Sequence, residues 1–163
     1  MSIKKDDLGY LQFVSEITFT EEFYAFKTEE FYQNGKNIYI GEGFKDLVLS
    51  SAEEISLRAV PSIKSFNLIK SAKDKQIRTG LPKDYIFENA GLFCVQLGLL
   101  LTSKKSELIS SGHANLFYVR GEGIDVIAVD IRQYFGTKVW YVRAFPATDT
   151  WWHDGLRVFS ANL

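Results

Sequence analysis

The sequence predicts an α+β fold in a single domain over residues 1–163, in which a central buried helix packs on a C-terminal antiparallel sheet and follows an N-terminal helix and short strands. Residues 82–105, PKDYIFENAGLFCVQLGLLLTSKK, would be apolar on nearly every side of a helix. From Asn115 onward, short apolar segments alternate with glycine and proline, as strands and turns do. The length of 163 residues, without a Pro-, Gly- or Ser-rich linker, fits one domain.

The N-terminal helix is predicted at residues 19–33. Thr18 and Glu21 have the spacing of a capping box, and the Asn-Gly pair at 34–35 is a good stop signal. A strand through residues 16–26, EITFTEEFYAF, is the alternative, because its rings and β-branched residues also suit a sheet. In both cases the aromatic rings are expected to face the core.

Three short strands are predicted next, at residues 37–44, 55–60 and 63–69. Each is rich in β-branched or aromatic residues and is bounded by glycine or proline. The segment that follows, SAKDKQIRTGLP at residues 71–82, is predicted to be a charged loop.

The central helix is predicted over about residues 84–104. Pro82 and Asp84 are typical of a first helical turn, and lysines follow the end of the apolar stretch. Cys94 lies well inside this helix, on a stripe of small residues with Ala90, Gly91 and Gly98. Because small residues let a helix approach a sheet closely, we predict that Cys94 is a buried, inert hydrophobic residue.

Four C-terminal strands are predicted, at residues 115–121, 124–133, 138–145 and 156–161. A three-residue hairpin loop would place Arg120 opposite Ile124. A four-residue loop would place Gln133 opposite Lys138.

Strand alternation then divides the side chains between two faces. The predicted core face is apolar and consists of Phe117, Ile127, Val129, Ile131, Trp140, Val142 and Ala144. The other face is mixed and consists of Tyr118, Arg120, Asp130, Arg132, Tyr141, Arg143 and Phe145. In this register Asp130 lies opposite Tyr141 and diagonal to Arg143. Guanidinium groups and aromatic rings suit a carboxylate or phosphate ligand. The same residue types also form the cross-strand pairs of an ordinary solvated sheet face, so both interpretations remain open.

The segment DTWWHDGLRVF, residues 149–159, is a second candidate site. If it is extended, Trp151 and Trp152 point in opposite directions, so one should pack and the other should lie at the surface. The outward tryptophan and His153 would then form one wall of a ligand site. Its charge would come from Arg143 or Arg157. The structural alternative is that the tryptophans close the core and a sheet edge, while His153 is a solvated turn residue.

Catalytic motifs are weak in this sequence. A thiol hydrolase built on Cys94 and His113 is disfavoured, because the cysteine does not lie at a helix N-terminus. The third catalytic residue is also missing, because in the predicted register Asp130 projects from the sheet face opposite His113. A metal-independent hydrolase or nuclease that uses His113 and His153 as acid and base is the alternative function. With two histidines and one cysteine, no metal site is predicted and no cofactor is expected.

Charge and hydropathy limit the class of partner. Although the net charge is -1, residues 58–83 form a basic band. Such a band could bind the phosphates of a nucleic-acid backbone, but its only aromatic ring for stacking on bases is Phe66. Nucleic acid is therefore disfavoured as a partner, and the band is interpreted as solvated or as facing the acidic N-terminal part. The single cysteine is compatible with a reducing compartment and no apolar stretch is long enough for a membrane span, so a cytoplasmic location is expected.

Together these observations predict a non-enzymatic binding or interaction module. Its aromatic-rich surface is expected to bind a protein partner or a small ligand. The candidate residues are Trp151, Trp152, His153, Arg143, Arg157, Tyr141 and Asp130. Neither the identity of the ligand nor the oligomeric state follows from the sequence.

Overall fold

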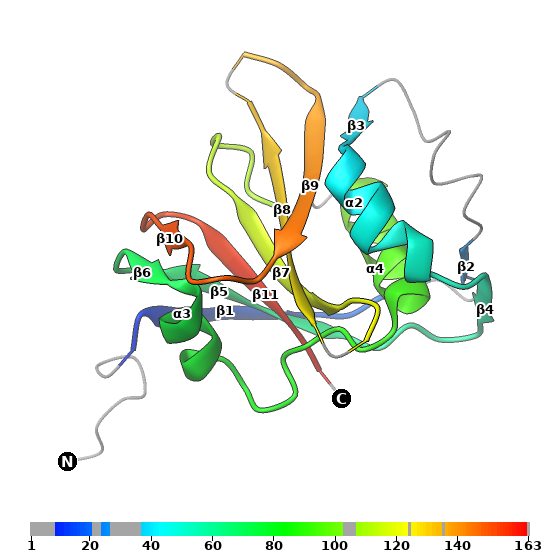
Figure 1. Ribbon diagram of the computed structural model, residues 1–163, viewed down its shortest axis with the longest axis horizontal. Coiled ribbons are helices and arrows are strands. Elements are labelled where there is room, and N and C mark those ends of the chain that lie inside the picture. Colours follow the sequence, from blue (N-terminus) through cyan, green and yellow to red (C-terminus); the bar gives the residue numbers. More distant parts are fainter. Residues whose placement is uncertain are drawn as a thin grey trace.

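A seven-stranded mixed sheet dominates the structure, a computed structural model that describes residues 9–20, 24–26, 37–102, 107–123, 125–134 and 136–162 (Figure 1). The strand order is β1-β5-β11-β7-β8-β9-β3. Its strands are β1 (Leu11–Ile17), β3 (Ile38–Ile40), β5 (Ile63–Leu68), β7 (Asn115–Arg120), β8 (Val126–Gln133), β9 (Trp140–Pro146) and β11 (Arg157–Ala161). The pairs β11–β7 and β3–β9 are parallel, and the other neighbours are antiparallel.

Two small sheets and a few short helices complete the described part of the chain. The small sheets pair β6 (Ala72–Lys73) with β10 (Trp151–Trp152), and β2 (Tyr24–Phe26) with β4 (Ile55–Leu57). The helical elements are α2 (Glu42–Leu47), the 3-10 turn η2 (Leu49–Ser51), α3 (Asp74–Gly80) and α4 (Ala90–Thr102). The fold is therefore rich in sheet, and the prediction of a helix-centred α+β fold is wrong.

The central helix is shorter than predicted because the residues before it pair with the sheet instead. The backbone N–H of Phe87 donates to the carbonyl of Tyr118, and the carbonyl of Phe87 accepts from the N–H of Arg120. The helix α4 begins only after Asn89, whose side-chain oxygen accepts a hydrogen bond from the N–H of Leu92 at 2.9 Å.

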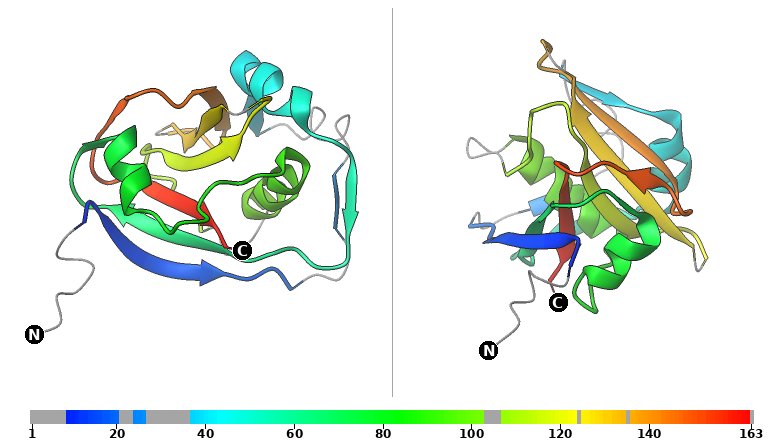
Figure 2. Two further views of the ribbon diagram at one scale, coloured as in Figure 1. Left: turned by 60° about the horizontal axis from the view of Figure 1, so that its bottom comes forward. Right: turned by 90° about the vertical axis from the view of Figure 1, so that its left-hand side faces the viewer.

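Both faces of the sheet are covered. On one face, α4 and α2 lie over β7, β8 and β9 and enclose a cluster that includes Phe44, Phe93, Phe117, Val142 and Phe159. On the other face, α3 and the β6–β10 pair cover a second cluster that includes Ile77, Leu116, Tyr118, Trp152 and Val158. Figure 2 shows the strong twist of the sheet between β1 and β9. We call the two sides the α4 side and the α3 side.

Two other helix and loop predictions need correction. The predicted N-terminal helix at 19–33 is wrong at Tyr24–Phe26, which pairs with β4, and residues 21–23 and 27–33 lie outside the described residues. The predicted charged loop at 71–82 contains β6 and the helix α3, whose Ile77 is fully buried. Only one side of α3 contacts the core, so most of its residues are charged or polar and the segment resembles a loop in the sequence.

The strand predictions at 37–44, 55–60 and 63–69 are confirmed at β3, β4 and β5. The second half of the first range is helical instead, since α2 begins at Glu42. There a Cβ on Gly43 would lie 2.2 Å from the carbonyl oxygen of Ala144, so glycine lets α2 touch β9.

The C-terminal hairpins form as predicted, but each register differs from the prediction by two residues. Arg120 pairs with Val126 rather than with Ile124, and Gln133 pairs with Trp140 rather than with Lys138. Because side chains alternate with a period of two, this error leaves every side chain on its predicted face. The apolar face packs against α4, as predicted.

Candidate functional site

Six side chains gather on the α3 side of β8, β9 and the edge strand β3, and we call them the Tyr–Arg face. They are Tyr39, Asp130, Arg132, Tyr134, Tyr141 and Arg143. Their neighbours Ile131 and Val142 are fully buried on the α4 side, so strand alternation directs these polar residues to the opposite side.

Asp130 is the centre of this face and is fully buried. It lies directly opposite Arg143, not opposite Tyr141 as the sequence register predicted. Its carboxylate accepts hydrogen bonds from Nε and Nη2 of Arg132, at 3.2 and 2.8 Å, and from Nη2 of Arg143. The two guanidinium groups share one carboxylate, which leaves one net positive charge at the surface.

Both arginines are held in place by Asp130 and remain accessible to solvent. The side chain of Arg143 is 47% exposed and that of Arg132 is 25% exposed. A guanidinium group has five N–H donors, and the bonds to Asp130 use only some of them. The remaining donors suit a carboxylate or a phosphate from outside the molecule.

Three tyrosines lie beside these arginines. The ring centroid of Tyr141 is 5.6 Å from that of Tyr39 and 4.7 Å from that of Tyr134, in tilted and edge-to-face arrangements. Tyr39 and Tyr134 are exposed, at 57% and 44%. Tyr141 also pairs with Arg132 across the strands. The face therefore combines exposed rings with fixed positive charge.

The second candidate site is divided by the structure. Trp151 is 52% exposed and Trp152 is 6% exposed, so the prediction that one tryptophan packs and the other lies outside is confirmed. The indole of Trp152 stacks on Phe145, and its Nε1 donates to the buried carboxylate of Asp74 at 2.7 Å. Trp152 is therefore part of the core and has no free polar group for a ligand.

Arg157 does not join Arg143, because the two lie on opposite sides of the sheet. Arg157 pairs with Asn115 in the register that places Val158 among the α3-side residues, so Arg157 itself points to the α4 side. There its Nη1 donates to the carbonyl of Glu107 at 2.8 Å and its Nε to Asn67 at 3.3 Å. Of the predicted site residues, the structure brings together Asp130, Tyr141 and Arg143.

The two histidines are not joined by a hydrogen bond in the described part of the chain. His153 is exposed, and the ring of His113 lies against Gly155, whose positive φ of 96° forms the turn before β11. Neither imidazole makes a hydrogen bond or ion pair with a described residue. The geometry therefore gives the hydrolase or nuclease alternative no specific support.

Cys94 is buried, as predicted, with 1% of its surface exposed. Burial in the α4-side cluster raises the pKa of its thiol far above the ordinary value, so the reactive thiolate is suppressed. The structure thus supports an inert residue at this position.

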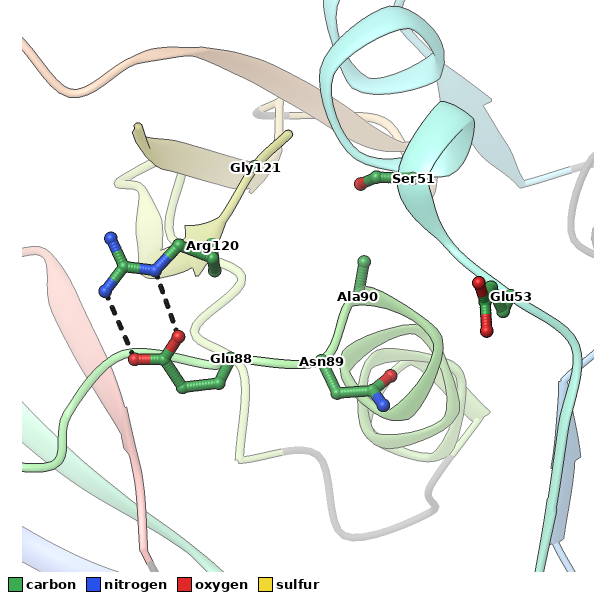
Figure 3. Close-up of a pocket in the computed structure, with 7 residues that line it drawn as sticks. All are labelled: Ser51, Glu53, Glu88, Asn89, Ala90, Arg120 and Gly121. Carbon is green, nitrogen blue, oxygen red and sulfur yellow. Dashed lines mark hydrogen bonds and ion pairs between the residues drawn. The ribbon is translucent and has the colours of Figure 1, made fainter. Parts of the chain in front are cut away.

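A polar cleft of about 190 Å³ opens at the start of α4 (Figure 3). Glu88 and Arg120 lie on one side of it and form a two-pronged ion pair, at 3.0 and 3.2 Å, while Ser51 and Glu53 approach from the η2 side. The hydrogen bonds from Arg120 lower the pKa of Glu88 below its usual value. Glu88 and Arg120 neutralise each other, and the hydroxyl of Ser51 donates to the carbonyl of Val48 rather than to a base in the cleft.

The basic band at residues 58–83 is dispersed over several elements rather than gathered on one. Lys64 lies opposite Glu16 in the β1–β5 pair, Lys73 forms an ion pair with Asp149, and Arg78 donates to the hydroxyl of Tyr85. Only the position of Lys64 opposite Glu16 agrees with the interpretation of the band as facing the acidic N-terminal part.

No group of three or more His, Cys, Asp or Glu side chains within the described ranges could hold a metal ion. Likewise, none of the helices that the structure describes has the length and hydropathy needed to cross a membrane. No family model, curated protein or solved structure matches the chain.

The sequence did not point to Tyr39 and Tyr134 as site residues. Alternation in IYI shows that Tyr39 faces away from its isoleucine neighbours, but nothing local shows that β3 pairs with β9. Tyr134 lies in the hairpin loop directly after β8, as predicted, but its ring contact with Tyr141 has no signal in the sequence. Both tyrosines reach the face only through pairings that the fold creates.

Proposed function

We propose that the protein is a binding module whose Tyr–Arg face holds a carboxylate-bearing segment of a protein partner. The observation that carries the proposal is the buried Asp130, which fixes Arg132 and Arg143 side by side while both remain open to solvent. Arginines held in this way lose less side-chain entropy when they bind a carboxylate.

The surrounding rings favour a protein partner over a small ligand. Tyrosine and arginine are enriched among the residues that contribute most to protein interfaces. On this face the rings of Tyr39 and Tyr134 are exposed beside the two arginines, as such side chains are in an interface before binding.

The test uses fluorescence anisotropy with a labelled acidic peptide that contains glutamate and one tyrosine, and with its counterpart in which glutamine replaces glutamate. We expect saturable binding of the acidic peptide that weakens at high salt, because exposed charges are screened. We expect the neutral peptide to bind at least about tenfold more weakly.

Two variants locate the binding to this face. Arg143→Gln should weaken binding by about tenfold or more, since a central arginine is a typical interface hot spot, whereas Asp130 keeps Arg132 as its partner. Tyr39→Ala should weaken it with unchanged stability, because the ring is exposed. Arg58→Gln is the matched control, an exposed arginine next to β4.

Three outcomes would contradict the proposal. The acidic peptide could fail to bind at millimolar concentration, the neutral peptide could bind equally well, or Arg58→Gln could weaken binding as much as Arg143→Gln. If benzoate alone bound as tightly as the peptide, the occupant would be a small carboxylate and not a protein segment.

A further inference from the structure

One side of β3 pairs with β9, and the other side is an end of the seven-stranded sheet (Figure 1). In the parallel register, the carbonyl of Asn37 accepts from the N–H of Trp140, and the N–H of Gly41 donates to the carbonyl of Val142. Backbone groups alternate in direction along a strand, so those of Tyr39 also point to β9. The residues between these three positions therefore direct their backbone groups away from the sheet.

Ile38 and Ile40 are those residues, and their N–H and C=O groups form the outer edge of β3. Within the part of the chain that the structure describes, neither residue makes a backbone hydrogen bond on this side. The chain that follows β3 turns back over β9, where Gly43 closely approaches the backbone of Ala144. The donors and acceptors of this edge are thus available to another strand.

The side chains of β3 suit an interface. The ring of Tyr39 is exposed on the α3 side, while Ile38 and Ile40 are half-buried against the α4-side cluster. The strand contains neither a charged residue nor a proline, which are residues that commonly prevent edge strands from pairing. The edge therefore combines partly exposed apolar side chains with unpaired backbone groups.

The opposite edge of the same sheet is protected. The strand β1 has a bulge between Phe13 and Ser15, which interrupts its regular pairing with β5. It also contains Glu16, whose carboxylate accepts hydrogen bonds from Ser62 and Asn162. Bulges and charges are known devices against the joining of sheets edge to edge. The contrast indicates that β3 is the edge at which another strand can add.

The sequence of β3 reads Ile-Tyr-Ile in both directions, so the strand is complementary to a second copy of itself. In an antiparallel pair centred on Tyr39, Ile38 lies opposite the partner's Ile40, and their N–H and C=O groups bond to each other. The two-fold axis repeats this pair, so every unpaired group of the edge is used. Tyr39 then faces the partner's Tyr39 at a non-hydrogen-bonded position, where side chains come closest.

We propose that the protein forms a symmetric dimer in which β3 of each copy pairs antiparallel with β3 of the other. A second copy is favoured over a foreign strand, because this palindromic strand satisfies its own backbone groups and brings only uncharged side chains opposite each other. The strand is short, so the interface is small and we expect a dissociation constant on the order of 100 µM. The monomer should therefore dominate in dilute solution.

The dimer would join the two sheets and place the two Tyr–Arg faces beside each other. The two-fold axis of an antiparallel pair is perpendicular to the sheet, so both α3 sides face the same direction. A partner with two acidic segments would then bind more tightly than a partner with one, through the higher effective concentration of the second segment. This consequence rests on the proposed function, whereas the dimer itself does not.

The experiment measures self-association without peptide, by sedimentation velocity at concentrations that span the expected dissociation constant. We expect the average mass to rise from that of the monomer toward twice that value. A protein that stays monomeric at millimolar concentration would overturn the proposal. Peptide binding is measured separately in dilute protein, so the failure of one result leaves the other intact.

Nuclear magnetic resonance of the ¹⁵N-labelled wild-type protein locates the interface without a mutation. The backbone amides of Ile38 and Ile40 should shift, and should exchange with solvent more slowly, as the protein concentration rises. The amide of Tyr39 is bonded to β9 and should be protected at every concentration. Association that leaves the amides of both isoleucines unchanged would exclude pairing at β3.

A pair of charge variants tests the two-fold axis. Tyr39→Lys and Tyr39→Glu each place like charges opposite each other, so each should weaken association by at least about tenfold. An equimolar mixture of the two should associate again, because lysine then faces glutamate. Tyr39 is exposed, so both variants should fold, and circular dichroism checks this. Phe13→Lys, at an exposed ring on β1, is the matched control and should leave association unchanged.

Three further results would contradict the proposal. Loss of association in Phe13→Lys would place the interface at β1, and failure of the mixture to associate would exclude an axis at Tyr39. If the protein stayed monomeric while a free Ile-Tyr-Ile peptide protected the amides of Ile38 and Ile40, the edge would accept a foreign strand and not a second copy.

Discussion

Trp152 and Asp74 lie 78 positions apart in the sequence and are joined by a hydrogen bond of 2.7 Å from the indole nitrogen to the carboxylate. The same carboxylate accepts from the hydroxyl of Tyr118 at 2.7 Å and from the backbone N–H of Thr150 at 3.0 Å. Three donors around a residue that is 1% exposed make Asp74 a structural anchor between α3, β7 and β10.

Asp74→Asn should destabilise the protein by about 3 kcal/mol, because an amide nitrogen would face donors and a charge-assisted bond would be lost. Urea unfolding followed by circular dichroism measures this change. Asp149→Asn is the control, since it removes only an exposed ion pair with Lys73 and should cost less than about 1 kcal/mol. Equal losses for the two variants would contradict the role of Asp74.

Tyr118 should make the protein lose stability at high pH. Burial, and next the adjacent Asp74 carboxylate, raise the pKa of Tyr118 above its ordinary value of 10.0. Above pH 10 the unfolded chain releases the phenol proton while the folded chain retains it, so this contribution to stability is present below pH 10 and decreases as the pH rises. Tyr118→Phe should be less stable at pH 7 but decline less steeply above pH 10. Parallel slopes in urea titrations from pH 7 to 11 would exclude this.

Truncation of the two adjacent tryptophans should change the free energy of unfolding by very different amounts. Trp152→Ala should cost about 3 to 5 kcal/mol, because a buried ring and its bond to Asp74 are lost. Trp151→Ala should change the stability by less than about 0.5 kcal/mol, since its ring is half exposed. If Trp151→Ala abolished binding of the acidic peptide while stability was unchanged, the ligand surface would lie at β10 rather than on the Tyr–Arg face.

Two glycines in the same helix provide a matched pair. A Cβ on Gly91 would lie 2.4 Å from the backbone oxygen of Glu53, whereas a Cβ on Gly98 would have no neighbour within 4 Å. Gly98→Ala should therefore stabilise the protein by about 0.5 to 1 kcal/mol through helix propensity. Gly91→Ala should destabilise it, because η2 and the backbone after it would have to move. Thermal unfolding of both variants checks the pair, and stabilisation by both would contradict the close approach.

Cys94 should be unreactive in the native state. Its thiol is buried and its pKa is raised, so a thiol reagent at pH 8 should label it only as fast as the protein opens. Cys94→Ala should cost about 1 to 2 kcal/mol, as expected for loss of a small buried group. Rapid labelling without denaturant would show that the helix packs less closely than the structure indicates.

Local pattern was sufficient to predict the faces of the C-terminal strands. Both hairpin registers were shifted by two residues, yet Ile131 and Val142 still faced the core and Asp130 and Arg143 still shared the other side. A period of two explains this, because only odd shifts exchange the faces. The pairing of Asp130 with Arg143 could not be derived, since it depends on the true loop length.

Pairings between distant segments were not predictable. The strand β1 was missed because LQFVSEI is exposed along most of its length and lacks a clear apolar alternation. The segment around Asp74 looked like a solvated loop, because its one buried acid is satisfied by Tyr118 and Trp152 from far along the chain. Gln96, similarly, has no distinguishing signal in the sequence, because its side-chain amide donates to the carbonyl of Pro61, which lies far from it along the chain.

The position of β11 has a consequence for the order of folding. This strand comes last among the described strands, yet it lies between β5 and β7 and joins β1 and β5 to β7, β8, β9 and β3 (Figure 1). On a ribosome, each group of strands could pair as soon as it emerged, but the edges of β5 and β7 would stay open until residues 157–161 were released. Open strand edges invite pairing with other chains. The interval before β11 inserts is therefore the period in which a nascent chain is most exposed to aggregation, and long-range closure of this kind is slow.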